Sequence, residues 1–229
     1  MKHSEWIEGL HLTLLYRADS LRAKGMSNYM KQNFDFYGIS STERRNIMSE
    51  YRKEIPLPKI VTGKDLVDFM VLSWGNFPRE LQYCALDIGR KYVKLLEMDD
   101  IEGIEYLITH KSWWDSVDSL APYFAASILS MDKSHALKKS EEWIASGNLW
   151  LQRSAIIYQL KQKTKTDTEI LEHNIMALID HKDFFIRKAI GWALREYAKT
   201  NPEFTLDFVE NHKDLLSNLS IREALKHFS

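Results

Sequence analysis

The segment Leu151-Gln152-Arg153-Ser154-Ala155 decides the fold, because its pattern recurs along the chain. The related segments are Leu81-Gln82-Tyr83-Cys84-Ala85, Phe185-Ile186-Arg187-Lys188-Ala189 and Ser220-Ile221-Arg222-Glu223-Ala224. Sliding the sequence by 34 to 35 residues superposes Asp118 on Arg153, then on Arg187 and Arg222. Helix pairs that repeat at such a period are typical of an α-solenoid. Because the tetratricopeptide pattern does not fit, HEAT-like repeats are predicted.

Apolar residues around these segments recur at helical spacing. Only five prolines and nine glycines occur in 229 residues, and alternating β-branched runs are scarce. Paired helices are predicted at 65–72 and 78–96, 101–109 and 113–130, 134–145 and 149–163, 169–180 and 184–198, and 202–211 and 221–228. The fold class is therefore predicted to be all-α, an α-solenoid of about six HEAT-like helix pairs.

The N-terminal part is predicted to hold helices that precede the pairs. Leu10, Leu14, Leu15 and Leu21 indicate one amphipathic helix, and shorter helices are expected at 29–34 and 42–51. The two prolines in 54–58 end this part, because proline interrupts a helix. We expect one domain over 1–229, with N-terminal helices in 1–55 and helix-pair repeats in 64–229.

The amino-acid composition limits the cellular compartment and the binding partners that can be expected. Lys and Arg number 31 against 32 Asp and Glu, so a DNA-binding surface would require the charges to be segregated in space. Cys84 is the only cysteine, which fits a reducing cytosol, and a buried structural thiol is favoured over a nucleophile. The N-terminus is charged and no apolar run approaches a membrane span of about 20 residues, so a cytoplasmic protein without membrane contact is expected.

The residues that usually hold cofactors are not arranged for it. The eight histidines show no metal-binding spacing, one cysteine cannot make a thiolate site, and Gly38, Gly63 and Gly75 are isolated. No metal and no other cofactor is therefore expected.

The segment Lys111-Ser-Trp-Trp-Asp-Ser-Val-Asp-Ser-Leu120 carries the chemistry. Trp114 and Asp118 are four residues apart, so on a helix they lie on one face. An aromatic ring beside a carboxylate suits a positively charged partner. The alternative is structural: Trp114 in the core, Asp118 on a solvated face, and Ser112 as the N-cap of the helix.

The repeat relation places an arginine near this carboxylate. Equivalent positions form a stripe across successive repeats, so Asp118 is expected beside Arg153, about one helix spacing (~10 Å) away. Arg153 then either binds a phosphate or makes a structural ion pair with Asp118.

Several motifs together resemble the AlkD-type DNA alkylation-repair glycosylases over about residues 26–227. They are Tyr29-Met-Lys31, Gly38-Ile-Ser-Ser-Thr-Glu-Arg-Arg45, Lys111-Ser-Trp-Trp-Asp-Ser-Val-Asp118, Leu149-Trp-Leu-Gln-Arg-Ser-Ala155 and the segment Phe184–Tyr197. The resemblance implies a concave face that holds double-stranded DNA, and hydrolytic release of purines alkylated at N3 or N7. It also implies that Trp114, Asp118 and Trp192 are catalytic and that Arg153 and Trp114 contact DNA.

Further DNA contacts are expected on the same grounds. In the N-terminal part these are Ser40, Ser41 and Arg45, where Ser40-Ser41-Thr42 replaces the family's usual Gln or Lys followed by Thr-Pro. That departure bears on how the N-terminal helices hold the opposite strand. Arg187 and Lys188 are phosphate contacts or part of a solvated face. The partner is alkylated duplex DNA, and the protein is expected to be monomeric.

The chemistry of the lesion fits these residues. A purine alkylated at N3 or N7 is cationic and leaves as a neutral base, so no general acid is needed and none is evident. Asp118 would stabilise the positive charge that develops on the sugar, and the rings of Trp114 and Trp192 would add cation–π attraction. No lysine in the motifs is placed as a Schiff-base nucleophile, so strand cleavage is not expected. The rival interpretations are a HEAT-like scaffold without catalysis and a binder of DNA structures that has lost it.

Overall fold

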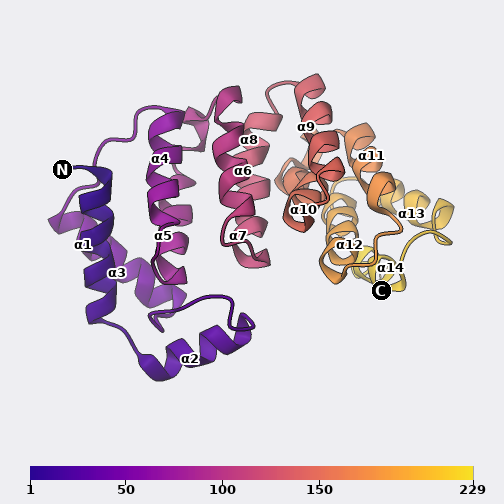
Figure 1. Cartoon of the computed structure of the whole chain (residues 1–229). Helices are drawn as coiled ribbons and strands as arrows, with labels where there is room; N and C mark the ends of the chain where they lie inside the picture. The colour runs from indigo at the N-terminus through magenta and orange to yellow at the C-terminus, as the bar shows by residue number, and fades with distance from the viewer. Residues whose placement is uncertain (229) are drawn as a thin grey trace. The chain divides into compact units, whose positions relative to one another are not determined.

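All regular structure in the computed structural model, which describes residues 1–228, is helical (Figure 1). No strand occurs in that range, and the all-α prediction is confirmed. The chain divides into two compact units, Met1–Gly103 and the part that begins at Ile104, with the boundary inside α6 (Ile101–Thr109). The expectation of one domain stays a prediction.

The first unit contains α1 (His3–Tyr16), α2 (Ser20–Tyr29), α3 (Ser41–Glu54), α4 (Gly63–Ser73) and α5 (Arg79–Gly89). Helix α1 packs on α3 and α4, and α5 packs on both of these. Trp6 is fully buried between α3 and α4, with its ring 5.1 Å from Tyr51 and 6.0 Å from Phe69. The Tyr51 hydroxyl donates to the Trp6 carbonyl at 3.0 Å, so this core also satisfies its polar groups.

Three details of the first unit were predicted wrongly. No helix forms at 29–34, because α2 ends at Tyr29 and Lys31 and Gln32 have φ of 58° and 61°, in the left-handed region. Leu21 does not extend the first helix but belongs to α2, where it is 81% exposed. The helix predicted at 78–96 is also shorter, since α5 ends at Gly89 and a 3₁₀ turn follows at Val93–Leu95.

The second unit contains α7 (Trp114–Ser119), α8 (Ala126–Leu129), α9 (Lys133–Ala145), α10 (Leu149–Ile157), α11 (Thr168–Leu178), α12 (Phe184–Ala198), α13 (Pro202–Asn211) and α14 (Asn218–Ala224). Helix α10 contacts α7, α9, α11 and α12, and α12 packs closely on α14. Successive second helices of the predicted pairs, α7, α10, α12 and α14, therefore lie side by side. The packing agrees with a helical solenoid.

Local caps explain where several of these helices begin. The carboxylate of Asp183 accepts from the amide of Phe185, and Asn201 caps α13, in which proline occupies the first turn. The predicted bounds of 101–109, 184–198 and 202–211 are confirmed. The predicted helix 113–130 is instead α7, a π-helical segment at Leu120–Ala125 and α8, and α10 becomes 3₁₀ at Tyr158–Lys161. The helix predicted at 221–228 is α14, three residues earlier in the sequence at its start.

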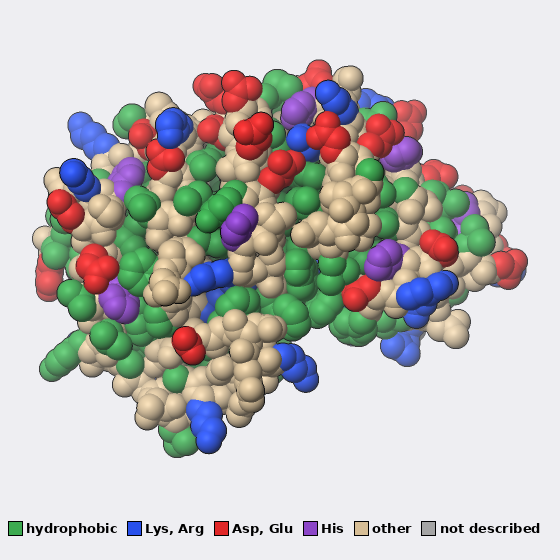
Figure 2. Space-filling view, viewed as in Figure 1, with side chains coloured by type: hydrophobic (Ala, Val, Ile, Leu, Met, Phe, Trp, Pro, Cys, Tyr) green, Lys and Arg blue, Asp and Glu red, His purple; other side chains and the backbone are tan. Residues whose placement is uncertain are grey.

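Charges of both signs are mixed on the surface of the second unit. Figure 2 shows acidic side chains over α6, and acidic side chains mixed with lysines over α9. Between these helices Lys139 pairs with Glu105 at 3.2 Å, and the Trp143 indole donates to the same carboxylate at 2.5 Å. None of the helices of residues 1–228 has the length and apolar content that a bilayer crossing requires.

Candidate functional site

Asp118 and Arg153 form a bidentate ion pair in the second unit. Asp118 lies near the end of α7 and Arg153 in the middle of α10. The Arg153 Nε donates to Oδ1 of Asp118 at 2.8 Å and Nη2 donates to Oδ2 at 2.9 Å. The arginine side chain is 3% exposed and the aspartate side chain 20% exposed. The structure thus brings together the two residues that the repeat relation places side by side.

The Arg153 guanidinium has two further contacts, both with α12. Its Nη1 donates to the carbonyl oxygen of Phe185 at 2.6 Å, and its Cζ lies 5.9 Å from the centroid of the Trp192 ring. Three of the five N–H donors of the guanidinium therefore have protein acceptors, and two remain for another acceptor. Arg153 connects α7, α10 and α12 and holds the Asp118 carboxylate in one orientation.

Burial governs the charge of Asp118. Desolvation raises the pKa of its carboxyl group above the usual range, and the nearby charge of Asp115 raises it further. The charge of Arg153 and its hydrogen bonds act in the opposite direction. The carboxylate is thus a desolvated anion whose charge is retained with the help of one buried cation.

The two tryptophans predicted to be catalytic are not core residues: Trp192 lies beside Arg153, and Trp114 precedes Asp118 by one turn of α7. Trp114 is the first residue of α7, Trp192 is on α12, and both are partly exposed. Gly191 precedes Trp192 because α14 comes too close for a side chain there: a Cβ atom would lie 2.5 Å from Cβ of Glu223. The position of Trp192 therefore depends on the contact between α12 and α14.

Three further aromatic rings support the pair, and sequence reasoning missed them. The ring of Trp113 lies 5.5 Å from that of Trp150 and 5.4 Å from that of Phe185, and the latter two are 5.0 Å apart. The Phe185 residue thus supplies both a ring of this cluster and the carbonyl that accepts from Arg153. The available signal was their place in the quoted motifs, one to three residues before Trp114, Arg153 and Arg187.

The start of α7 is not capped by Ser112, as the structural alternative for this segment had it. The Ser112 hydroxyl donates instead to the Ile108 carbonyl at 2.7 Å. Trp113 occupies the N-cap position with extended backbone, after Lys111 at φ 49°. The π-helical segment that contains Pro122 begins two residues after Asp118. Such wide turns often occur at functional sites.

Arg187 and Lys188 are engaged with the protein in this structure. The Arg187 Nε donates to the His181 carbonyl at 2.9 Å. The Lys188 ammonium is 2.7 Å from Glu223, which also pairs with Arg195. These contacts hold the pKa of Glu223 at about 2, mainly through the hydrogen bond from Lys188. A DNA contact by Arg187 or Lys188 stays a prediction.

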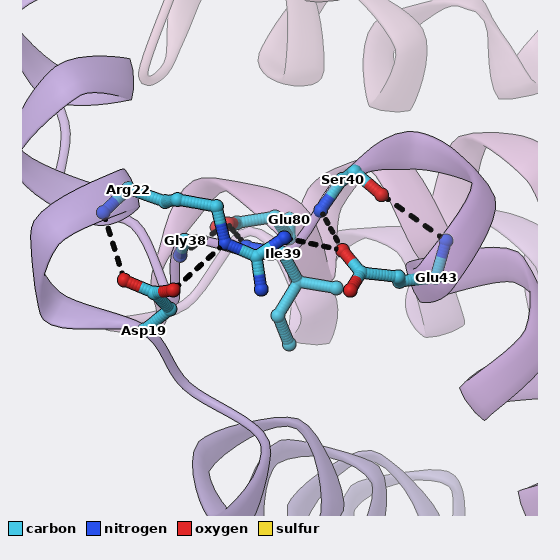
Figure 3. A network of polar contacts seen from close by, with 7 residues as sticks. All are labelled: Asp19, Arg22, Gly38, Ile39, Ser40, Glu43 and Glu80. Carbon is cyan, nitrogen blue, oxygen red and sulfur yellow. Dashed lines mark hydrogen bonds and ion pairs between the residues drawn. The ribbon is translucent and has the colours of Figure 1, made fainter.

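Ser40, Ser41 and Arg45 lie at the start of α3 in the first unit. The Ser40 hydroxyl accepts from the amide of Glu43 at 3.3 Å, and the Ser40 amide donates to the Glu43 carboxylate at 3.0 Å (Figure 3). This capping box orients the start of the helix. The hydrogen bonds from Ser40 and from Arg22 hold the pKa of Glu43 at about 2. Ser41 and Arg45 are exposed.

The loop before Ser40 is fixed by a buried carboxylate. Glu80 of α5 accepts from the backbone amides of Tyr37, Gly38 and Ile39 at 3.0, 2.9 and 3.2 Å (Figure 3). Burial raises the pKa of Glu80, and the backbone hydrogen bonds oppose the shift. Gly38 is required because its φ is 83° and a Cβ atom would lie 2.1 Å from the Asp19 carbonyl oxygen. Glu80 therefore sets the position from which α3 starts.

No group of histidine, cysteine or acidic side chains in residues 1–228 is arranged to hold a metal ion. Cys84 is buried, and desolvation raises the pKa of its thiol to about 11. The thiol is therefore protonated at neutral pH, which agrees with a structural role.

Comparisons with known proteins point to one family. The family model described as "DNA alkylation repair enzyme" matches residues 10–228. A solved structure described as a predicted DNA alkylation repair enzyme from Enterococcus faecalis is 30% identical to the chain, with a TM-score of 0.79. That match covers 93% of this chain and 97% of the other. No curated protein matches.

Proposed function

Because the chain belongs to the DNA alkylation repair enzyme family, we propose that it hydrolyses the N-glycosidic bond of cationic purines alkylated at N3 or N7 in double-stranded DNA. The observation that carries the proposal is the desolvated Asp118 carboxylate, held by Arg153 next to Trp192. A fixed anion of this kind stabilises positive charge more strongly than water does, because it needs no reorganisation during the reaction.

The reaction places the charge on the sugar. An alkylated purine already carries positive charge and leaves as a neutral base, so its departure requires no proton from the protein. As the bond breaks, Asp118 stabilises the cationic sugar and orients the attacking water. Trp114 and Trp192 contribute through their ring faces, each by about 0.5–2 kcal/mol. The product is an abasic site, and the DNA strand stays intact.

Arg153 acts in this scheme through Asp118. Its two hydrogen bonds keep the carboxylate charged and oriented. The side chain is 3% exposed, so a phosphate beside the lesion reaches its two remaining N–H donors only where the DNA backbone approaches that small opening closely. Ser40, Ser41 and Arg45 are proposed to contact the DNA backbone from α3. We further propose that the enzyme works as a monomer in the cytoplasm and needs no cofactor.

A second candidate function is binding of DNA or a protein partner without catalysis. It is favoured by one observation, that both oxygens of Asp118 accept from Arg153, as in a purely structural ion pair. The two functions differ in a chemical product, since only the first releases a free base.

A panel of single-lesion duplexes tests the proposal. We expect release of 7-methylguanine and 3-methyladenine, detected by chromatography of free bases, and no release of hypoxanthine, ethenoadenine or uracil. Excision of the uncharged lesions would require a proton donor and would contradict the charge-driven mechanism. No release from any duplex, with intact DNA binding, would favour the non-catalytic function.

A further inference from the structure

A basic pocket lies between α3 and α5 in the first unit. It has a volume of about 540 Å³, and its lining includes Arg45, Arg52, Lys53 and Lys91. The only acidic side chain in the lining is Asp87. The Nη2 of buried Arg44 is 2.9 Å from Oδ2 of Asp87, so the negative charge of that carboxylate is already balanced. The pocket therefore has a large excess of positive charge.

The four cations have no carboxylate partner in the part of the chain that the structure describes. Elsewhere in the same unit Arg22 pairs with Asp19 and Glu43, and Lys64 pairs with Asp68. Like charges gathered around one pocket repel each other, and a bound anion removes that cost. Arg45, Lys53 and Lys91 are exposed and Arg52 is partly exposed, so all four can reach a ligand from solvent.

The arrangement of the cations selects an extended anion. Arg45, Ser49 and Arg52 follow at helical spacing on one face of α3, over about 10 Å of the helix, with Lys91 contributed by the turn after α5. One strand of duplex DNA advances about 3.4 Å per phosphate along its axis, so about three successive phosphates match this length. A single phosphate ion would leave most of the pocket unfilled.

We propose that this pocket binds about two or three successive backbone phosphates of one DNA strand, as a contact separate from the residues around Asp118. The inference rests on the proposed function only in that DNA is the partner. Arg45 was expected to contact DNA, and the pocket adds Arg52, Lys53 and Lys91, which no motif indicated.

The salt dependence of binding to undamaged duplex tests the pocket. Each lost phosphate contact flattens the slope of log K against log salt by about one. We expect a decrease of about two for Arg52→Gln combined with Lys53→Gln, and of about one for Lys91→Gln in the turn after α5. The control combines Lys24→Gln with Lys59→Gln, which removes the same charge from exposed positions outside the pocket. Equal slopes for the pocket and control variants would overturn the proposal.

Two further measurements separate the remaining outcomes. Excess inorganic phosphate should not raise the Tm of the protein, because the pocket is not expected to bind free phosphate. A phosphate-dependent rise in Tm that the double variant loses, with an unchanged DNA slope, would assign the pocket to free phosphate and overturn the proposal. The binding assay uses undamaged DNA, so absence of base release would contradict the proposed function and leave this inference intact.

Discussion

Arg153 determines, at the scale of single residues, what Asp118 can do. The carboxylate is largely desolvated and depends on one buried cation for its charge. Such a pair is a weak source of stability when complete, because both groups lose hydration. Removing one member is costly, because the other is left charged and unpaired.

Replacement of Arg153 by alanine should therefore lower the free energy of unfolding, by an amount that depends on pH. The loss is expected to be on the order of 3 kcal/mol at neutral pH. Without the arginine, the pKa of Asp118 in the folded state rises further above its pKa in the unfolded state. The folded state is therefore destabilised at any pH above the unfolded-state pKa. The penalty disappears once the pH falls below both pKa values. Urea unfolding of the variant and the wild type across acid and neutral pH measures it.

The same variant separates the two roles of the arginine. If the remaining N–H donors bind phosphate, the salt slope for undamaged duplex should also decrease by about one. If the slope is unchanged, the only role left for Arg153 is to orient Asp118. A stability difference that does not vary with pH would contradict the coupling between the two residues.

At the scale of elements, the contact of α12 with α14 sets the position of Trp192. Gly191 allows the approach, and Glu223 of α14 pairs with Lys188 and Arg195 of α12. Ser220 of α14 also donates to the Arg187 carbonyl at 2.9 Å. Close packing and three polar contacts therefore act on one helix–helix interface.

Gly191→Ala should force these two helices apart. The added Cβ would lie 2.7 Å from the Ser220 carbonyl oxygen, a backbone atom that cannot turn aside. We expect a loss of about 1–3 kcal/mol, as for other overpacked sites. Gly25→Ala is the matched control, because that helical position is open and alanine is favoured there by up to about 1 kcal/mol. Equal melting temperatures for Gly191→Ala and the wild type would refute the close contact.

Glu223 should make this interface sensitive to acid. Its pKa is about 2 in the folded protein against 4.5 for a free glutamate, so its stabilising effect is complete above about pH 4.5 and is lost as the pH falls toward 2. Glu223→Gln should therefore be less stable than the wild type at neutral pH, by about 2 kcal/mol, and the gap should close in acid. Glu210→Gln, in an exposed pair with Lys213, should change stability little. A gap that persists at low pH would contradict the assigned interaction.

The elements also show what a sequence can predict. The helices at 184–198 and 202–211 were predictable because their apolar spacing coincides with caps at Asp183 and Asn201. The pairing of Asp118 with Arg153 followed from the repeat period. The failures involve other causes: left-handed Lys31 and Gln32 end a helix that apolar spacing would continue, and the π-helical segment around Pro122 has no periodic signature. The Phe185 carbonyl could not be identified, because a backbone acceptor depends on packing and not on residue type.

At the scale of the whole molecule, a nearly neutral chain gathers several cations around one pocket. Acidic side chains and lysines mix over α9, whereas the cations around the pocket between α3 and α5 have no carboxylate partner within residues 1–228. The family match extends over residues 10–228 and so includes residues of both compact units. The site around Asp118 is built within the second unit, and the proposed phosphate pocket within the first. Catalysis and part of the DNA affinity are thus assigned to different parts of the chain.

The catalytic charge of Asp118 is tested most directly by the rate of 7-methylguanine release from duplex DNA with enzyme in excess. Asp118→Asn keeps the shape of the side chain and removes its charge, and the rate should fall by a factor of about 10² to 10³. Affinity for undamaged duplex should change little and serves as the check that the variant is folded. Asp207→Asn removes the same charge from an exposed position on α13 and should react like the wild type. A near-normal rate for Asp118→Asn would contradict the proposal that this carboxylate stabilises the cationic sugar.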